Sequence, residues 1–247
     1  MNLDIHTDVI LKAEGLGISF GGVHAVKSVD FELRAGELRC LIGPNGAGKT
    51  TFFRLLSGQH QPTRGTVSFK GKPLKSLLPF QVSRLGIGIK TQVPSLFEGM
   101  TVAENIELAV ERGASHKENA AMVNEVLDHI GLTALRDVSC AELAHGQRQW
   151  VELGQILASR PAVALLDEPA AGMTHAESVK TVEIIRGITK YSAVIVVEHD
   201  MDFIRMIGDR VTVFEQGEII AEGNFQEVAK DPQVRAAYLG RKGADDA

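Results

Sequence analysis

The sequence predicts an α/β protein with antiparallel strands near its beginning and a parallel sheet in its second half. Residues 9–42 alternate short apolar runs with glycine-containing turns, as antiparallel strands do, and end in a buried strand at 38–42. Further on, the continuous apolar runs VALLD (163–167) and AVIVV (193–197) are typical of strands covered on both faces. A helical stretch, SVKTVEIIRGITK, lies between these two strands, and such alternation builds a parallel sheet.

The remaining stretches predict shorter elements. FFRLLSG predicts a helix that Gly58 closes, and TVSFKGKPL predicts a hairpin. Residues 101–131 are strongly helical with a polar break near 112–118, and a further helix follows in VELGQILASR. DFIRMIGD is helical, VTVFEQGEIIAEG closes as a hairpin, and the tail RKGADDA is expected to fray.

Composition limits the class of protein. The 247 residues are 44% hydrophobic and 23% charged, which suits one substantial α/β domain, and the net charge of −5 argues against a general nucleic-acid binder. Cys40 and Cys140 stand in no metal-binding pattern, so neither a disulfide nor a zinc site is expected, as in a reducing cytoplasm. The sequence shows no signal peptide and no run of ~18 apolar residues, so another polypeptide would have to hold the protein at a membrane.

A phosphate-binding motif follows the strand at 38–42. The stretch GPNGAGKT fits G-x-x-x-x-G-K-[ST] and stands between a predicted strand and a predicted helix. Its glycines let backbone N–H groups turn toward phosphate oxygens, and the helix N-terminus adds the positive end of its dipole. Lys49 is expected to reach the β- and γ-phosphates and Thr50 to ligate Mg²⁺; the alternative is a glycine-rich turn with a solvated lysine. The predicted nucleotide-binding residues here are Gly43, Pro44, Asn45, Gly46, Ala47, Gly48, Lys49, Thr50 and Thr51.

Two further strands bring acidic and imidazole side chains to the same sheet edge. VALLDE places Asp167 at the end of its strand, beside the phosphate loop, where it can hold the water shell of the metal. Glu168 follows and is placed to polarise an attacking water as a general base, with a simple surface carboxylate as the alternative. His199, in VVEHD, ends the next buried strand and is placed to sense a γ-phosphate, although a lone histidine is usually structural.

Together these residues resemble the ATPase subunits of ABC transporters, over nearly the whole chain. GPNGAGKTT looks like the Walker A motif of that family, VALLDE like its Walker B motif, and His199 like its switch histidine. Gln92 stands where the family has a glutamine that contacts metal and water and also faces the permease. Phe20, in SFGG, occupies the position of the aromatic that stacks on adenine, with a core-strand phenylalanine as the alternative.

The resemblance implies a P-loop NTPase (RecA-like) core with an N-terminal antiparallel β subdomain and a helical signature subdomain. Residues 8–91 and 162–232 would form the nucleotide-binding core with its β subdomain, 92–161 the helical subdomain, and 233–247 a C-terminal tail. The whole chain would then be a single ABC ATPase domain. ATP and Mg²⁺ are the cofactors that the resemblance implies.

LAHGQ falls where the family has its LSGGQ signature at a helix start, so the resemblance assigns nucleotide contacts to Ala144, His145, Gly146 and Gln147. In the family, two subunits pair head to tail, and each signature faces the γ-phosphate of ATP held by the other subunit. The helix dipole and the N–H groups around Gly146 favour an anion without a side chain. Three positions depart from the common pattern: Ala144 replaces a serine, His145 replaces a glycine, and Thr174 stands where many members have aspartate.

Within that family the chain is most similar to the branched-chain amino acid and urea uptake group. PAAG, EHDM and AYLG resemble members of the group, and HGQRQW, VELG and EPAAGMT resemble its urea-uptake ATPases, in particular the first of two paired ATPases. The resemblance implies an ATPase that powers import of a small polar solute, urea or an amide or amino acid. Its partners would be transmembrane permease subunits, a second ABC ATPase subunit and, indirectly, an external solute-binding protein, at the cytoplasmic face of the plasma membrane and without nucleic acid.

Other functions stay open at this stage. A branched-chain amino acid importer fits the same motifs, because the solute touches the permease and the binding protein and not the ATPase. A soluble ABC ATPase of DNA repair or translation usually carries a long coiled-coil insertion or a second cassette, and the sequence shows neither. A regulator that binds nucleotide without hydrolysis is opposed by Glu168 and His199, whereas Ala144 and Thr174 are compatible with it. The sequence also leaves open whether the active pair is a homodimer or a heterodimer.

Overall fold

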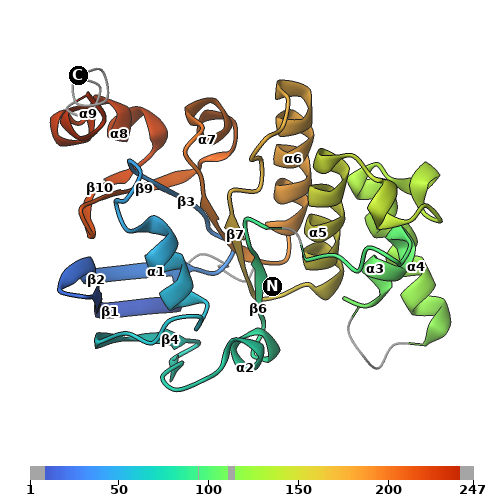
Figure 1. Ribbon diagram of the computed structural model, residues 1–247, viewed down its shortest axis with the longest axis horizontal. Helices are drawn as coiled ribbons and strands as arrows, with labels where there is room; N and C mark the ends of the chain where they lie inside the picture. The colour runs from blue at the N-terminus through green and yellow to red at the C-terminus, as the bar shows by residue number, and fades with distance from the viewer. Residues whose placement is uncertain (1–8, 94, 111–114, 240–247) are drawn as a thin grey trace, which may run out of the picture.

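Two β-sheets form the frame of the molecule. The computed structural model describes residues 9–93, 95–110 and 115–239. A four-stranded sheet has the order β2-β1-β4-β5 and a six-stranded sheet the order β10-β9-β3-β8-β7-β6, with helices packed around both (Figure 1). The strands are β1 (Val9–Phe20), β2 (Val23–Arg34), β3 (Leu38–Ile42), β4 (Arg64–Phe69), β5 (Lys72–Pro73), β6 (Ile87–Lys90), β7 (Val163–Asp167), β8 (Ala193–Val197), β9 (Arg210–Glu215) and β10 (Glu218–Gly223).

The small sheet is antiparallel and the large one mostly parallel, as expected. β1 pairs antiparallel with β2 and β4, and β4 with β5. In the large sheet β3 pairs parallel with β8 and β9, and β7 pairs parallel with β6 and β8; only β10 runs antiparallel, to β9. Five parallel strands therefore end at one common edge, and the loops that follow them lie together there.

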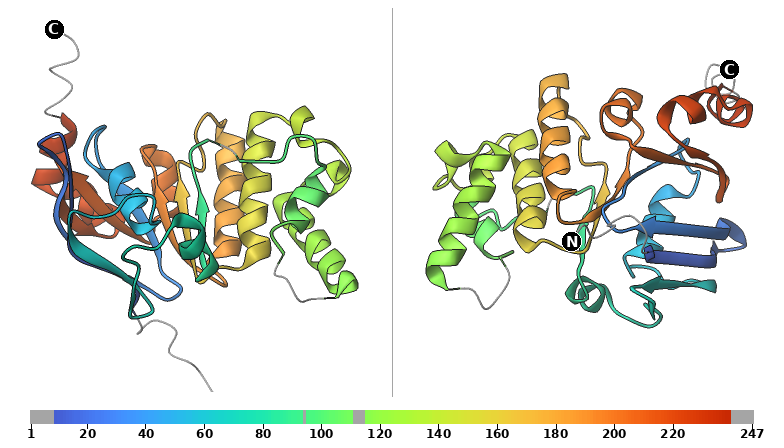
Figure 2. Two further views of the ribbon diagram at one scale, coloured as in Figure 1. Left: turned by 60° about the horizontal axis from the view of Figure 1, so that its bottom comes forward. Right: turned by 180° about the vertical axis from the view of Figure 1, so that it is seen from behind.

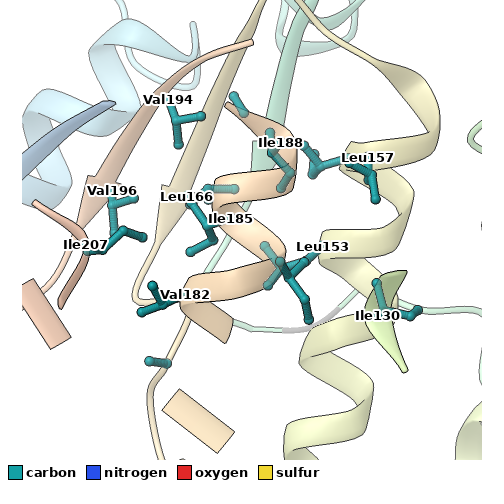
Figure 3. Packing of buried hydrophobic residues seen from close by; sticks show 14 of the residues in the cluster. Ile130, Leu153, Leu157, Leu166, Val182, Ile185, Ile188, Val194, Val196 and Ile207 are labelled. Atoms are coloured by element: carbon teal, nitrogen blue, oxygen red, sulfur yellow. The ribbon is translucent and has the colours of Figure 1, made fainter. Parts of the chain in front are cut away.

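Alternating side chains divide the interior into two cores on opposite faces of the large sheet. Leu166 of β7 and Val196 of β8 face the core beneath α5, α6 and α7, which Figure 3 shows at close range. Leu165 and Ile195, one residue earlier on each strand, face the other core, between the antiparallel sheet, α1 and the large sheet. This period of two on strands covered on both faces explains why their sequences are apolar throughout.

Helices α3, α4 and α5 form the predicted helical region, and α3 and α4 begin with a side-chain cap. Thr101 caps α3 and Ser115 caps α4, each paired with a glutamate three residues on, and α4 ends at Gly131, whose φ is 73°. The polar break predicted near 112–118 overlaps residues 111–114, which lie outside the described residues.

The helices are α1 (Lys49–Leu56), α2 (Pro79–Arg84), α3 (Val102–Glu107), α4 (His116–Ile130), α5 (His145–Ser159), α6 (His175–Ile188), α7 (Met201–Ile207), α8 (Phe225–Lys230) and α9 (Pro232–Leu239), with short 3₁₀ turns at Thr133–Leu135 and Cys140–Glu142.

Some elements differ from the sequence-based expectation. The segment expected as a tail from 233 begins as helix α9, which packs on α8 and β10 through buried residues such as Val234; the predicted fraying of RKGADDA lies outside the described residues. α2, β6 and α8 were not predicted either, since each has only four to six residues. None of the helices in the described part of the chain is long and apolar enough to span a bilayer.

Trp150 joins the helical region to the sheet core. It is the only tryptophan in the sequence and lies on α5. Its indole N–H donates to the hydroxyl oxygen of Thr181 on α6 at 3.0 Å, and the Thr181 hydroxyl donates to the carbonyl of Glu177 at 2.9 Å. Views from two further directions show α5 and α6 side by side between the sheet and α4 (Figure 2). Trp150 thus packs at the junction between α5 and α6.

Phe52 is the residue whose truncation should most damage the second core. It is fully buried on α1, and its ring lies 5.4 Å from that of Phe31 on β2 and 5.0 Å from that of Phe214 on β9. Phe52→Ala is expected to lower the free energy of unfolding by about 3–5 kcal/mol, measured by urea denaturation. Phe97→Ala is the control: that side chain is 60% exposed, and its loss should change stability by less than about 0.5 kcal/mol. Equal effects would show that Phe52 does not hold the two sheets together.

Candidate nucleotide-binding site

The loop between β3 and α1 has the backbone that phosphate binding requires. Gly43 and Gly48 have φ values of 149° and 105°, and a Cβ atom at either would lie 2.2–2.5 Å from a carbonyl oxygen of a neighbouring segment. Glycine is therefore demanded at both positions. α1 begins at Lys49 with no side-chain cap and no acidic residue in its first turn, so its N-terminal N–H groups face the loop as an anion site.

A cavity of about 540 Å³ opens over this loop. Lys49 is buried beneath it, and its ammonium group donates to the carbonyl oxygens of Gly43 (2.5 Å) and Pro44 (3.1 Å). These bonds keep the charge at the loop, within reach of phosphate oxygens that the loop would bind. The lining comes from the phosphate loop and the start of α1, the first residues of β2, one carboxylate and the turn between β9 and β10: Val23, His24, Ala25, Lys27, Asn45, Gly46, Ala47, Gly48, Lys49, Thr50, Thr51, Glu168, Gln216 and Gly217.

Phe20 lies at the end of β1, just before the turn whose other side lines the cavity. Its side chain is 47% exposed, and its ring meets that of His60 edge-on at 5.4 Å. The alternative of a core-strand phenylalanine is thus wrong, because the residue remains almost half exposed to solvent. The adenine-stacking role itself stays a prediction.

The three residues expected to act in catalysis meet at the edge of the parallel sheet. Gln92 follows β6, Glu168 follows β7 and His199 follows β8. The amide Nε2 of Gln92 donates to Glu168 Oε2 at 2.9 Å, and Nδ1 of His199 lies 3.3 Å from Glu168 Oε1. Each oxygen of Glu168 thus has one partner from a neighbouring strand end, which fixes the carboxylate over the cavity.

Glu168 also has an unusual backbone. Its φ is 46°, in the left-handed region that costs a side-chain-bearing residue of order 1–3 kcal/mol, while its N–H still donates to the carbonyl of Val197 at 2.9 Å. The turn continues with the N–H of Ala171, which donates to the carbonyl of Glu168 at 3.2 Å. Backbone strain of this kind concentrates at functional sites, and here it turns the carboxylate out of the sheet.

The residues at this edge fit a magnesium ion. Burial raises the pKa of Asp167, and the negative charge of Glu168 raises it further, against the cations Arg54, Lys90 and Lys49. A divalent cation would offset that cost. Mg²⁺ commonly takes one or two protein oxygens and completes its octahedron with phosphates and water, so the carboxylate of Asp167 and the hydroxyl of Thr50 would be enough to hold it.

Glu198 is a site residue that sequence reasoning missed. Its buried carboxylate accepts the N–H of Ala170 at 3.0 Å and the N–H of His199 at 3.2 Å, so it ties the turn after Glu168 to the turn that carries the histidine. Burial raises its pKa, and these two N–H bonds oppose the rise. The signal in the sequence is an acidic residue that directly follows the apolar run AVIVV.

The LAHGQ segment forms the start of α5, on the opposite face of the large sheet from α1. Ala144 is its N-cap and offers no side-chain bond, while Gln147 folds back so that its Oε1 accepts the N–H of Ala144 at 3.0 Å. None of Ala144, His145, Gly146 and Gln147 lines the cavity over the phosphate loop. Within one chain, the two predicted phosphate-binding helix ends are therefore apart.

Side chains of the same chain pack closely on the LAHGQ segment. Gly146 is buried, and a Cβ atom there would lie 2.5 Å from Oε1 of Glu177, so the end of that side chain would have to move aside. Nε2 of His145 lies 3.1 Å from the carbonyl oxygen of Ala171 in the loop after Glu168. Thr174 caps α6 together with Glu177, which accounts for a threonine at that position.

Comparison with known proteins identifies the family. Residues 26–171 match the model of the ABC transporter family, and 218–244 match that of the branched-chain amino acid ATP-binding cassette transporter. The chain belongs to the ABC transporter ATPases. It is 34% identical to the high-affinity branched-chain amino acid transport ATP-binding protein LivG of Salmonella typhimurium, over 94% of this chain and 98% of that protein.

Solved structures agree with this assignment. The ADP conformation of MJ1267, an ATP-binding cassette of an ABC transporter, superposes with a TM-score of 0.82 at 29% identity over 95% of this chain and all of that one. The dimeric post-hydrolysis structure of the cassette MJ0796, bound to ADP and Pi, gives a TM-score of 0.77 at 25% identity over 87% of this chain and 99% of that one. The predicted ABC cassette fold is confirmed.

The biochemical class is confirmed with it. This ABC ATPase belongs to the branched-chain amino acid group and is the ATP-binding, ATP-hydrolysing subunit of an importer. Its nucleotide is ATP, with Mg²⁺ as the usual partner ion.

Glu168→Gln tests the carboxylate at the centre of this site. The amide keeps the shape of the side chain but cannot accept a proton from water, and a general base contributes roughly 10²–10⁴-fold. Turnover of MgATP should fall by at least about 100-fold while the dissociation constant for ATP stays near that of the wild type. Glu183→Gln, at an exposed position of α6, should hydrolyse ATP normally. Near-normal turnover in Glu168→Gln would remove this residue from the base role.

Gly146→Asp tests the start of α5 and separates two effects of a new side chain there. The added carboxylate would meet Glu177 of the same chain and would also repel a phosphate at the helix end. We expect a lower melting temperature together with loss of ATP turnover in the assembled transporter. Glu177→Ala alone weakens the cap of α6, so the double variant is compared with it: the two should have the same melting temperature, and only the double variant should lack turnover. Recovery of turnover in the double variant would mean that only intrachain packing requires glycine at 146.

Proposed function

We propose that this ABC ATPase powers uptake of a small polar solute of the amino acid and amide class through separate permease subunits. The observation that carries the proposal is the full-length similarity to LivG, a branched-chain amino acid transport protein, together with the match of residues 218–244 to the C-terminal model of that group.

Urea is the solute that we propose within this class. The support is the similarity of HGQRQW, VELG and EPAAGMT to the urea-uptake members; the first two stretches lie in α5, and the third begins at Glu168. A branched-chain amino acid is the second candidate, and the similarity to LivG favours it. The two differ in the permease and the solute-binding protein that the ATPase serves.

For the chemistry we propose a division of labour among residues at the sheet edge. Lys49 and the loop N–H groups hold the phosphates, and Phe20 stacks on adenine. Thr50 and Asp167 would hold Mg²⁺, which neutralises charge on the phosphates when it is bound. Glu168 accepts the proton of the attacking water.

Gln92 and His199 complete this arrangement from the two neighbouring strand ends. They hold the Glu168 carboxylate in place, and Gln92 also contacts the metal and its water. His199 senses the γ-phosphate. Their support is the pair of contacts to opposite oxygens of Glu168.

A head-to-tail pair of ATPase subunits would complete each site. Ala144, His145, Gly146 and Gln147 would then contact ATP held by the partner, through backbone N–H groups at the α5 start. The position of these residues on the sheet face opposite α1 supports the proposal, since they do not reach the phosphate loop of their own chain. The related cassette MJ0796 has been described as a dimer with ADP and Pi.

The surroundings of the subunit follow from the same proposal. The ATPase would lie at the cytoplasmic face of the plasma membrane, bound to its permease, while an external binding protein delivers the solute. Residues 92–161 would form the subdomain that meets both the permease and the partner ATPase, on a core made of 8–91 and 162–232, with 233–247 as the C-terminal extension. A net charge of −5 supports the absence of a nucleic-acid partner.

Uptake measurements in cells that lack this chain test the solute. Cells in which the chain is deleted should lose most high-affinity accumulation of radiolabelled urea and keep accumulation of labelled leucine. Complementation with the wild type should restore urea uptake, and complementation with Lys49→Ala should not, because the loop then lacks its phosphate-binding charge. Loss of leucine uptake instead would assign the chain to branched-chain amino acids; loss of neither would reject the proposed solute class.

A further inference from the structure

A buried ion pair is formed by a residue just before Gln92 in the chain. Lys90 is the last residue of β6, and its ammonium nitrogen lies 3.6 Å from Oε2 of Glu152 on α5. The two side chains are 0% and 5% exposed. Burial lowers the pKa of Lys90 and raises that of Glu152, while the attraction between the two charges opposes both shifts. Charges this deep are rare in proteins unless each has a partner.

The same carboxylate binds the chain on the far side of Gln92. Oε1 of Glu152 accepts the backbone N–H of Ser95 at 2.7 Å. One side chain of α5 therefore contacts Lys90 before Gln92 and Ser95 after it. Since Gln92 donates to Glu168 from between these two contacts, the position of α5 sets the position of the amide that holds the Glu168 carboxylate.

α5 is also the helix that starts with LAHGQ. Glu152 follows His145 by seven residues, or about 10 Å along the helix axis. α5 packs tightly on β6, because Gly88 leaves room: a Cβ atom there would lie 3.1 Å from Cδ1 of Ile156. A rigid helix thus joins the residues that would meet ATP of a second subunit to the segment that carries Gln92.

We propose that Glu152 is a positioning residue for ATP hydrolysis: through Lys90 and Ser95 it holds the Gln92 segment to the signature helix. Movement of α5 when its N-terminus meets the partner's nucleotide is then passed to Gln92 and on to Glu168. The inference rests on the proposed roles of Gln92, Glu168 and the α5 start. Burying Lys90 and Glu152 costs free energy, and on this inference the pair is kept because it transmits movement from the start of α5 to Glu168.

A purely structural role makes a different prediction, which allows a test. Replacing both members of a buried ion pair by apolar residues is often neutral or stabilising, whereas removing one partner is strongly destabilising. If the pair serves only stability, Lys90→Met combined with Glu152→Leu should behave like the wild type in every respect. If Glu152 positions the Gln92 segment, the double variant should be stable yet slow, because no group then holds the N–H of Ser95.

The experiment uses the full-length chain and measures kcat and KM for MgATP, the dissociation constant for ATP, the melting temperature, and amide hydrogen exchange at residues 91–93. Glu152→Gln keeps an acceptor for Ser95 but removes the charge; we expect kcat to fall about tenfold, exchange at 91–93 to quicken, and ATP affinity to stay within about twofold. Glu152→Ala should be slower still. The double variant should recover the melting temperature and not kcat. Glu98→Gln is the control, because Glu98 pairs with Arg148 of α5 at an exposed position, and all its measured values should match the wild type.

Three results would overturn the inference. They are a wild-type kcat in Glu152→Gln, recovery of both kcat and melting temperature in the double variant, and a slow Glu98→Gln variant equal to Glu152→Gln. Gln92→Ala, measured alongside, separates this failure from failure of the proposed catalytic roles. A wild-type rate in Gln92→Ala rejects the role of Gln92 and the inference with it, whereas a slow Gln92→Ala beside a normal Glu152→Gln rejects the inference alone.

Discussion

Parallel pairing between neighbouring strands of the large sheet is the constraint on which the site depends. β3, β6, β7 and β8 run in the same direction, so the residues that follow them emerge at one edge although they are far apart in sequence. The phosphate loop, Gln92, Glu168 and His199 each begin within two residues of the end of one of these strands. A register shift of one residue in β7 would turn Asp167 to the other face of the sheet, and no adjustment of the following turn could restore it. The arrangement of the site residues therefore depends on the pairing and register of the strands before it depends on the side chains themselves.

The sequence predicts those features that depend on short stretches. GPNGAGKT, Asp167 and His199 could be located because each adjoins an apolar run long enough to identify as a strand, and the structure places them at that edge. Gln92 was found only through family resemblance, because the strand before it, IGIK, is too short and too rich in glycine to stand out. α9 was taken for a tail, yet Asp231 accepts two backbone N–H bonds at its start, with a proline at the first helical position.

Contacts between distant residues could not be predicted. The packing of Gly146 on Glu177 and the pairing of Lys90 with Glu152 depend on how α5 lies against α6 and β6, and nothing local in the chain encodes those distances. The same holds for Glu198, whose carboxylate binds the turn after Glu168 from another strand. Such contacts are set by packing of whole elements, which a single sequence without an alignment does not reveal.

Two buried cations show how differently charge can be used in one fold. Arg39 on β3 has partners in four directions: Glu37, Glu222, the hydroxyl of Thr212 and the carbonyl oxygen of Glu32. A guanidinium with this many hydrogen bonds is held in one position. It joins the two sheets near the start of β3, at the opposite end of that strand from the phosphate loop. Lys90 is held by fewer bonds, and Oε2 of Glu152 has no hydrogen-bond partner among the described residues. Dense bonding fixes the two sheets to each other, whereas the Lys90–Glu152 pair joins one strand end to one helix, so that a shift of the helix is passed to that strand end.

The hydrogen bond between Trp150 and Thr181 makes the intrinsic fluorescence of this protein sensitive to the contact between α5 and α6. A lone tryptophan makes intrinsic fluorescence a single-site signal, free of the overlap that usually obscures it. The emission of an indole depends on the polarity around its N–H group, and here that group bonds across the contact between α5 and α6. Any rearrangement that slides one helix along the other changes the spectrum without a label or a substitution. Stopped-flow mixing with nucleotide can therefore time the movement of the helical region in the native chain.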